Sequence, residues 1–132
     1  DAIAAFKQAV AIAPDYADAY YALGVRYGRV EQPSAAIDAF KKGIALQPND
    51  AAAYISMGGA CEDLGQCGDA IDTYRKLIDM RPNYAIAYYF IGHCYAALGQ
   101  DAAALIAYEE YPRLEPTGDR SDQVRQAISA IR

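Results

Sequence analysis

The sequence predicts an all-α fold built as an array of helix pairs, and two regular spacings carry that prediction. Prolines recur every 34 residues, at Pro14, Pro48, Pro82 and Pro116. Tyrosines keep the same step, at Tyr20, Tyr54 and Tyr88. A period of this length is the signature of a helical solenoid, in which each repeat is one pair of short helices.

Aligned on the prolines, the 132 residues divide into whole and partial repeats of a single domain. The ranges are 1–16 for a half repeat that holds a second helix only, 17–50, 51–84 and 85–118 for three whole repeats, and 119–132 for a final helix. Because the chain opens inside a repeat and lacks an initiator methionine, we expect it to be a piece of a longer protein.

The first half of each whole repeat predicts a helix with one packing face. In the second repeat this face holds Tyr54, Met57, Gly58 and Cys61, whose spacing of i, i+3, i+4 and i+7 places them on one side. The matching positions are Tyr20, Leu23, Gly24 and Tyr27, then Tyr88, Ile91, Gly92 and Tyr95. Glycine inside a helix costs about 1 kcal/mol relative to alanine, so its recurrence in register predicts close approach by a neighbouring helix.

The second half of each repeat predicts a helix that packs against that glycine. A small residue is followed four positions later by an aromatic one, at Ala36 and Phe40, Ala70 and Tyr74, and Ala104 and Tyr108. The half repeat keeps the pattern with Ala2 and Phe6. Seven tyrosines at packing positions are therefore expected in the core: Tyr20, Tyr27, Tyr54, Tyr74, Tyr88, Tyr95 and Tyr108.

The turns between the helices carry their own signals. Gly65 and Gly99 are predicted to end first helices as left-handed caps, and each proline of the series is predicted to end a second helix. Glu31 replaces the capping glycine of the first whole repeat, which costs about 1 kcal/mol if the left-handed conformation is kept. Pro33 either offsets that cost by stiffening the unfolded chain, or the turn differs locally.

The end of the array departs from the pattern in two ways. Pro112 removes an amide donor from the last second helix, so that helix is expected to end or kink near Tyr111. The final segment keeps apolar residues at helical spacing and is otherwise polar, which predicts an amphipathic capping helix. Its apolar residues are Val124, Ala127, Ile128 and Ile131.

These positions resemble the tetratricopeptide repeat, which places Tyr, Leu-Gly and Tyr, then Gly, Ala, Phe or Tyr, and Pro at this spacing. The resemblance covers essentially the whole chain. It implies antiparallel helix pairs stacked into a right-handed superhelical solenoid, whose first helices line a concave groove. It also implies a non-enzymatic module for protein–protein interaction.

The candidate binding site is the groove face of the first helices. The predicted peptide-binding residues are Tyr21, Val25 and Arg29 in the first whole repeat, Ile55, Glu62 and Asp63 in the second, and Ile86, Tyr89, Phe90 and His93 in the third. An exposed apolar strip commonly marks a binding site, and this one favours an amphipathic helix or an extended hydrophobic peptide of a partner protein. The alternative interpretation is that Ile86, Tyr89 and Phe90 pack on adjacent units or on the capping helix.

Two modes of recognition that the resemblance could imply are missing from the groove. Co-chaperone members hold a peptide carboxylate with a clamp of Lys, Asn and Arg, and sugar-transferase-like arrays carry a ladder of Asn. The clamp positions here hold Tyr21, Val25, Ser56, Ile86 and Phe90, and the ladder positions hold Ala22, Ser56 and Phe90. The sequence therefore predicts an apolar, aromatic groove without charged clamps.

Charge and hydropathy exclude two classes of partner. Twelve basic and seventeen acidic residues give a formal net charge of −5. That charge opposes binding to nucleic acid, and no stripe of Lys and Arg reverses it. The longest uncharged apolar runs fall far below the roughly 18 residues needed to span a bilayer, so no membrane insertion is expected.

The three cysteines argue against a disulfide framework and favour a reducing compartment such as the cytoplasm. Cys61, Cys67, His93 and Cys94 are the residues from which a metal or redox site could be built. They lack a CxxC or another recognised ligand spacing, and Cys61 and Cys94 fall at packing positions. We therefore expect buried, inert thiols, with no metal and no cofactor. A single histidine without an orienting acid gives no basis for catalysis.

Two other functions fit the same sequence. The apolar strip could join copies of the chain into a homo-oligomeric scaffold, since the truncated first unit exposes the packing face of a lone helix. Alternatively, the array could position or regulate an enzyme elsewhere in a longer parent chain.

Overall fold

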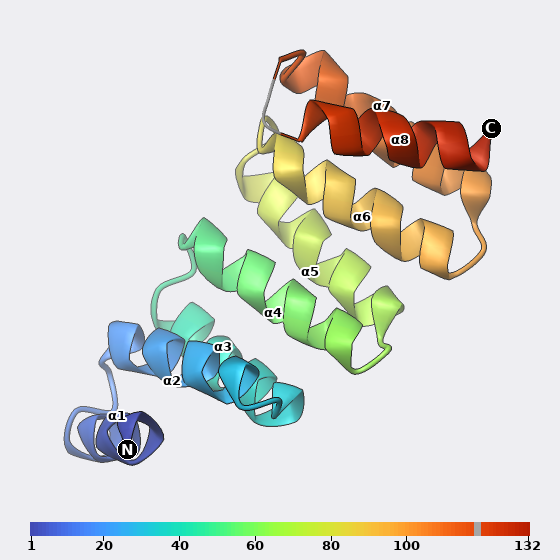
Figure 1. The fold of residues 1–132 in the computed structure, drawn as a ribbon. Helices are drawn as coiled ribbons and strands as arrows, with labels where there is room; N and C mark the ends of the chain where they lie inside the picture. Colours follow the sequence, from blue (N-terminus) through green and yellow to red (C-terminus); the bar gives the residue numbers. More distant parts are fainter. Residues whose placement is uncertain (118–119) are drawn as a thin grey trace. The chain divides into compact units, whose positions relative to one another are not determined.

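The computed structural model describes residues 1–117 and 120–132, and within these residues the chain is all-α (Figure 1). The helices are α1 (Ala2–Ile12), α2 (Ala17–Arg29), α3 (Pro33–Leu46), α4 (Ala51–Asp63), α5 (Cys67–Met80), α6 (Ala85–Ala97), α7 (Asp101–Leu114) and α8 (Ser121–Ile131). Gly118, the expected end of the third whole repeat, and Asp119, the expected start of the final helix, lie outside the described residues.

The 34-residue period recurs in the helix boundaries. The first helices α2, α4 and α6 have 13 residues each, and the second helices α3, α5 and α7 have 14. Each second helix ends two residues before a proline of the series, as predicted. Asp50 begins α4 as its N-cap, with Oδ1 accepting the backbone N–H of Ala52 at 3.0 Å. The prediction of an all-α solenoid of helix pairs is confirmed.

The three turns inside the repeats share one left-handed geometry. The φ angles are +60° at Glu31, +72° at Gly65 and +76° at Gly99. The residue after each cap donates its backbone N–H to the fifth residue before it, from Gln32 to the Tyr27 carbonyl at 2.9 Å and from Gln66 to the Cys61 carbonyl at 2.8 Å. Glu31 therefore keeps the turn that glycine makes elsewhere, and the turn does not differ locally.

Pro112 does not end α7. The helix continues to Leu114 and closes with the Glu115 N–H donating to the Tyr111 carbonyl at 2.7 Å. Of the two expected outcomes, an end or a kink near Tyr111, the first was wrong. A proline in the last turn of a helix removes one amide donor, while the residues after it still close that turn.

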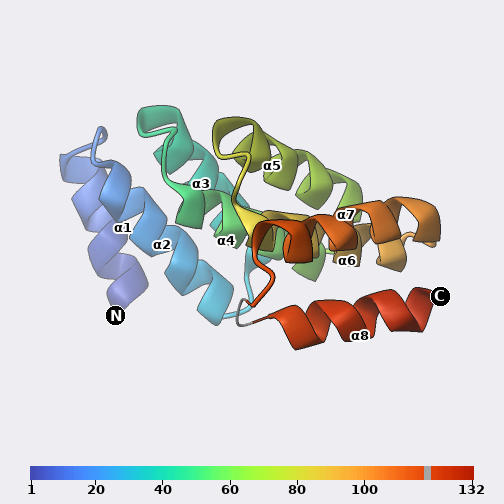
Figure 2. The ribbon, with the colours of Figure 1, turned by 90° about the horizontal axis from the view of Figure 1, so that it is seen from above.

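The chain forms two compact units, residues 1–66 and 67–132, and the boundary falls between α4 and α5. In the first unit α1 packs on α2, α2 on α3, and α3 on α4. In the second unit α5 packs on α6, α6 on α7, and α7 on α8. Figure 1 and Figure 2 show α1, α2 and α3 as neighbouring layers of the first unit.

Glycine and aromatic residues meet between the paired helices, as the sequence predicted. A Cβ atom added to Gly24 of α2 would lie 2.7 Å from Phe40 Cε1 of α3. One added to Gly92 of α6 would lie 2.6 Å from Tyr108 Cδ1 of α7. A side chain at either position would overlap the aromatic ring and force it to shift, so this close contact explains why glycine is used despite its cost in a helix.

The end of the second unit is covered by α8. Val124 of α8 is 1% exposed and lies in a buried cluster with Tyr108 and Tyr111 of α7. Ala127, Ile128 and Ile131 pack against the same cluster from the apolar face of α8. None of the described helices combines the length and the apolar character that crossing a membrane requires.

Candidate functional site

In the first unit, a groove lies between the first helices α2 and α4 and has α3 as its floor. Its cavity measures about 340 Å³. Val25, Gly28 and Arg29 of α2 form one wall. Ser56, Gly59 and Asp63 of α4 contribute the other wall, and Ala36 and Phe40 of α3 contribute the floor. Three residues of the predicted site, Val25, Arg29 and Asp63, are thus brought together.

Two glycines keep the groove open. A Cβ atom added to Gly28 or to Gly59 would meet no described atom within 4 Å, unlike one added to Gly24. Both lie inside helices, where glycine costs about 0.5–1 kcal/mol relative to alanine. Packing within the described part of the unit gives no reason for either glycine. Close approach of another backbone along the groove would give one.

The groove carries one charge of each sign above an apolar floor. Val25 is 40% exposed, and Arg29 and Asp63 are exposed on opposite walls. Arg29 and Asp63 form no ion pair with each other among the described residues. Their charges are therefore available to orient a bound segment by its own charged side chains.

Tyr21 is half-buried and holds the end of α3. A Cβ atom added to Gly43 would lie 2.5 Å from Tyr21 Cε1, so the ring lies directly over that glycine. The hydroxyl of Tyr21 donates toward the carbonyls of Gly43, at 3.0 Å, and Gln47. The Gly43 carbonyl also accepts the Gln47 N–H at 2.8 Å, whereas the carbonyl of Gln47, the C-cap residue of α3, has no later helical N–H to bond it. Tyr21 therefore satisfies a helix terminus.

The pKa of the Tyr21 hydroxyl is raised, first by burial and then by the negative charge of Asp50. Both effects disfavour the phenolate, because burial removes its hydration and a nearby carboxylate repels it. Tyr21 is thus held in its neutral form, which is the form that can donate to the α3 carbonyls.

In the second unit, the apolar strip of α6 makes contacts within the unit. Ile86 and Tyr89 pack against the cluster beneath α8, and the Tyr89 ring centroid lies 6.0 Å from that of Tyr108. Phe90 stacks on Tyr74 of α5 with ring centroids 5.5 Å apart. The guanidinium of Arg120 lies 5.9 Å from both the Tyr89 and Phe90 centroids. This geometry favours the packing interpretation for the strip.

The remaining predicted site residues are not gathered into the groove of the first unit. Ile55 and Glu62 are half-buried on α4 and do not line that cavity. His93 is exposed on α6. The peptide-binding role of all these residues remains a prediction.

The cysteines give no ligand cluster. Cys61 and Cys94 are buried and Cys67 is half-buried. In the described part of the chain, no three His, Cys, Asp or Glu side chains come together in a way that could hold a metal ion.

Four tyrosines that the sequence placed in the core line open clefts instead. Tyr20 and Tyr27 of α2, and Tyr88 and Tyr95 of α6, are half-buried, whereas Tyr54, Tyr74 and Tyr108 are buried. The clefts lie between consecutive second helices. These clefts were not predicted from the sequence. A signal for them was present, because Lys7 and Arg75 are basic residues at matching positions, 68 residues apart.

Comparison with known proteins assigns the family. One family model, described as tetratricopeptide repeat, matches residues 21–81 and 62–119, and a second, described as TPR repeat, matches residues 1–30. The chain belongs to the tetratricopeptide repeat family, as its repeating residues had indicated. No curated protein matches the chain.

Solved structures share the fold. A crystal structure of MamA is 29% identical, with a TM-score of 0.89, over 98% of this chain and 74% of MamA. The type III secretion chaperone SycD of Yersinia enterocolitica, in complex with a peptide of the translocator YopD, is 19% identical with a TM-score of 0.80, over 86% of this chain and 90% of its own. The first TPR of Spaghetti (RPAP3), bound to an HSP90 peptide, is 22% identical with a TM-score of 0.75, over 87% and 92%.

Proposed function

We propose that the chain is a protein-interaction module that binds a peptide or helix of a partner protein in the groove between α2 and α4. The observation that carries the proposal is the pair of glycines, Gly28 and Gly59, whose missing side chains leave the groove walls open. Two proteins of the same fold, SycD and RPAP3, hold peptides of other proteins, which supports this kind of use.

The groove indicates the chemistry of its ligand. Val25 is 40% exposed on the groove wall, above the buried Ala36 and Phe40 of the floor. Burying its apolar surface under a ligand contributes about 25 cal/mol for each Å² removed from water. Arg29 and Asp63 fix the direction of a segment that carries both charges. The proposed ligand is therefore an amphipathic helix or extended peptide with an apolar contact face.

Alanine at both groove glycines tests the proposal. Gly28→Ala with Gly59→Ala should raise the free energy of unfolding, because each alanine favours the helix by about 0.5–1 kcal/mol and meets no described atom. The same methyl groups should narrow the groove and weaken peptide binding at least ten-fold. Peptides selected from a random display library on the unmodified chain serve as ligands, with affinity measured by fluorescence anisotropy.

Gly68→Ala is the matched control. Gly68 lies in α5, and a Cβ atom added to it also meets no described atom within 4 Å. This variant should gain helix stability without losing affinity. If the double variant is more stable and still binds every selected peptide as tightly as the unmodified chain, the groove is not the binding site.

A further inference from the structure

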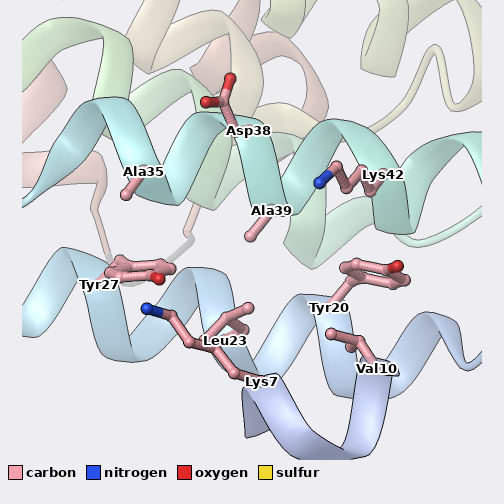
Figure 3. A pocket seen from close by; sticks show the side chains of 9 residues that line it. All are labelled: Lys7, Val10, Tyr20, Leu23, Tyr27, Ala35, Asp38, Ala39 and Lys42. Atoms are coloured by element: carbon pink, nitrogen blue, oxygen red, sulfur yellow. The ribbon is translucent and has the colours of Figure 1, made fainter. Parts of the chain in front are cut away.

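Two clefts of the same construction recur in the two units. In the first unit, the α1–α3 cleft is bounded by the second helices α1 and α3, with Tyr20 and Tyr27 of α2 between them (Figure 3). In the second unit, the α5–α7 cleft has Tyr88 and Tyr95 at the matching places. Each cavity measures about 310 Å³, and every lining residue of the first cleft has its counterpart 68 positions later in the second.

The α1–α3 cleft places a cation over each of its aromatic rings. The Lys7 Nζ atom from α1 lies 5.8 Å from the centroid of Tyr27. The Lys42 Nζ atom from α3 lies 6.0 Å from the centroid of Tyr20. Two ammonium groups therefore line one cleft from opposite walls, each within cation–π distance of a tyrosine ring.

Two lysines and one aspartate line the cleft, so its charged lining is positive overall. Neither Lys7 nor Lys42 forms an ion pair among the residues that the structure describes. Asp38 of α3 also lines the cleft, but its carboxylate points away from the two tyrosine rings (Figure 3). The α1–α3 cleft is thus a cationic, aromatic-lined site on a protein with a formal net charge of −5.

The second cleft has the same frame but different chemistry. Arg75 lies 5.9 Å from the Tyr95 centroid, as Lys7 does over Tyr27. However, Glu110 stands at the position of Lys42, and Ile106, 70% exposed, at the position of Asp38. The paired ammonium groups are therefore a property of the α1–α3 cleft and do not follow from the repeat itself.

We propose that the α1–α3 cleft is a second binding site, which takes an acidic linear segment of a partner protein. Carboxylates of the segment pair with Lys7 and Lys42, and an apolar side chain rests between the half-buried rings of Tyr20 and Tyr27. No described residue lines both this cleft and the α2–α4 groove, so the two sites can be occupied independently.

Charge reversal tests the proposal. A random peptide display library is selected on the unmodified chain and, in parallel, on the Lys7→Glu, Lys42→Glu variant. Asp and Glu should be enriched among peptides that bind only the unmodified chain. In fluorescence anisotropy, these acidic peptides should lose at least ten-fold in affinity for the variant, and their binding should weaken as salt is raised.

Lys41→Glu with Lys76→Glu is the matched control, because both lysines are exposed outside the cleft and the net charge changes by the same amount. This variant should keep the affinity of the unmodified chain, and circular dichroism should show that both variants retain their helices. Equal affinity of the two variants for the acidic peptides overturns the proposal, as does selection without acidic enrichment. A fluorescein-labelled oligothymidylate that binds through Lys7 and Lys42 more tightly than the peptides would overturn it in favour of nucleic acid.

The glycine variant of the α2–α4 groove distinguishes binding in the α1–α3 cleft from binding in that groove. Gly28→Ala with Gly59→Ala should leave the affinity for acidic peptides unchanged. Loss of those peptides in the glycine variant would place them in the groove and remove the evidence for a second site.

Discussion

At the scale of single residues, Tyr21 shows how one side chain can serve the fold where the sequence predicted a ligand contact. Its ring covers Gly43, and its hydroxyl donates toward the carbonyls of Gly43 and of Gln47, the C-cap residue of α3. The sequence places Tyr21 on the groove face of α2. It does not reveal the partner 22 residues away, because that contact depends on how closely α3 approaches.

Tyr21→Phe should lower the free energy of unfolding by about 0.5–1.5 kcal/mol at neutral pH, since it removes the hydroxyl and leaves the ring in place. The raised pKa of Tyr21 adds a pH dependence with a defined sign. A tyrosine whose pKa is higher in the folded state contributes stability that is fully present below its unfolded value of 10.0 and is lost as pH rises through the folded value.

Urea unfolding of both proteins between pH 8 and about 12 checks this linkage. The difference in unfolding free energy between the unmodified chain and Tyr21→Phe should shrink above the ordinary tyrosine pKa. A difference that stays constant across the range would show that the hydroxyl is not linked to folding.

At the scale of elements, the turns were the most predictable part of the chain and Glu31 is their weakest member. Gly65 and Gly99 adopt the left-handed geometry at no steric cost, whereas Glu31 adopts the same geometry with a side chain that opposes it. The hydrogen bonds of the turn from α2 to α3 and the proline that follows at Pro33 maintain it.

Glu31→Gly should raise the free energy of unfolding by about 1 kcal/mol, because glycine relieves the left-handed strain. Gly99→Ala makes the opposite change at the matching turn of the second unit, and it should lower the free energy of unfolding by a similar amount. Thermal and urea unfolding measure both changes. A destabilised Glu31→Gly variant would mean that the glutamate side chain makes a compensating interaction.

The helices can be predicted from the local sequence pattern, whereas the clefts between them cannot. The prolines and glycines marked where α2 to α7 begin and end, because those residues act on the backbone beside them. Whether Tyr20 and Tyr27 would be sealed or open depends on the distance between α1 and α3. That distance is set by many side chains together, so the same tyrosine position is half-buried at Tyr20 and buried at Tyr54.

At the scale of the whole molecule, the family and the all-α solenoid were predicted correctly from the 34-residue period. The binding role of the predicted site residues stays a prediction, and the structure shows where those residues lie. Val25, Arg29 and Asp63 line one groove, while the strip of Ile86, Tyr89 and Phe90 makes packing contacts within the second unit. Residues on the groove face of α6 could not be sorted from the sequence, because the contribution of α8 to the packing depends on tertiary structure.

Self-association is the second function to test at this scale. No residue of α1 is fully buried, and Ile12 at its end is 85% exposed. If this face joins copies of the chain, the mass measured by light scattering rises with protein concentration, and Ile12→Asp lowers it again. A constant monomer mass over the accessible concentrations rules out assembly through α1.

Because the lining residues of the two clefts match at a spacing of 68 residues, the side chains of one cleft can be substituted into the other. Asp38 and Lys42 could be exchanged for the Ile106 and Glu110 found at the matching places without altering the buried residues that hold the helices together. The ligand preference of one cleft could then be transferred to the other. Protein design could in this way choose the ligand of each cleft separately while keeping the same helical framework.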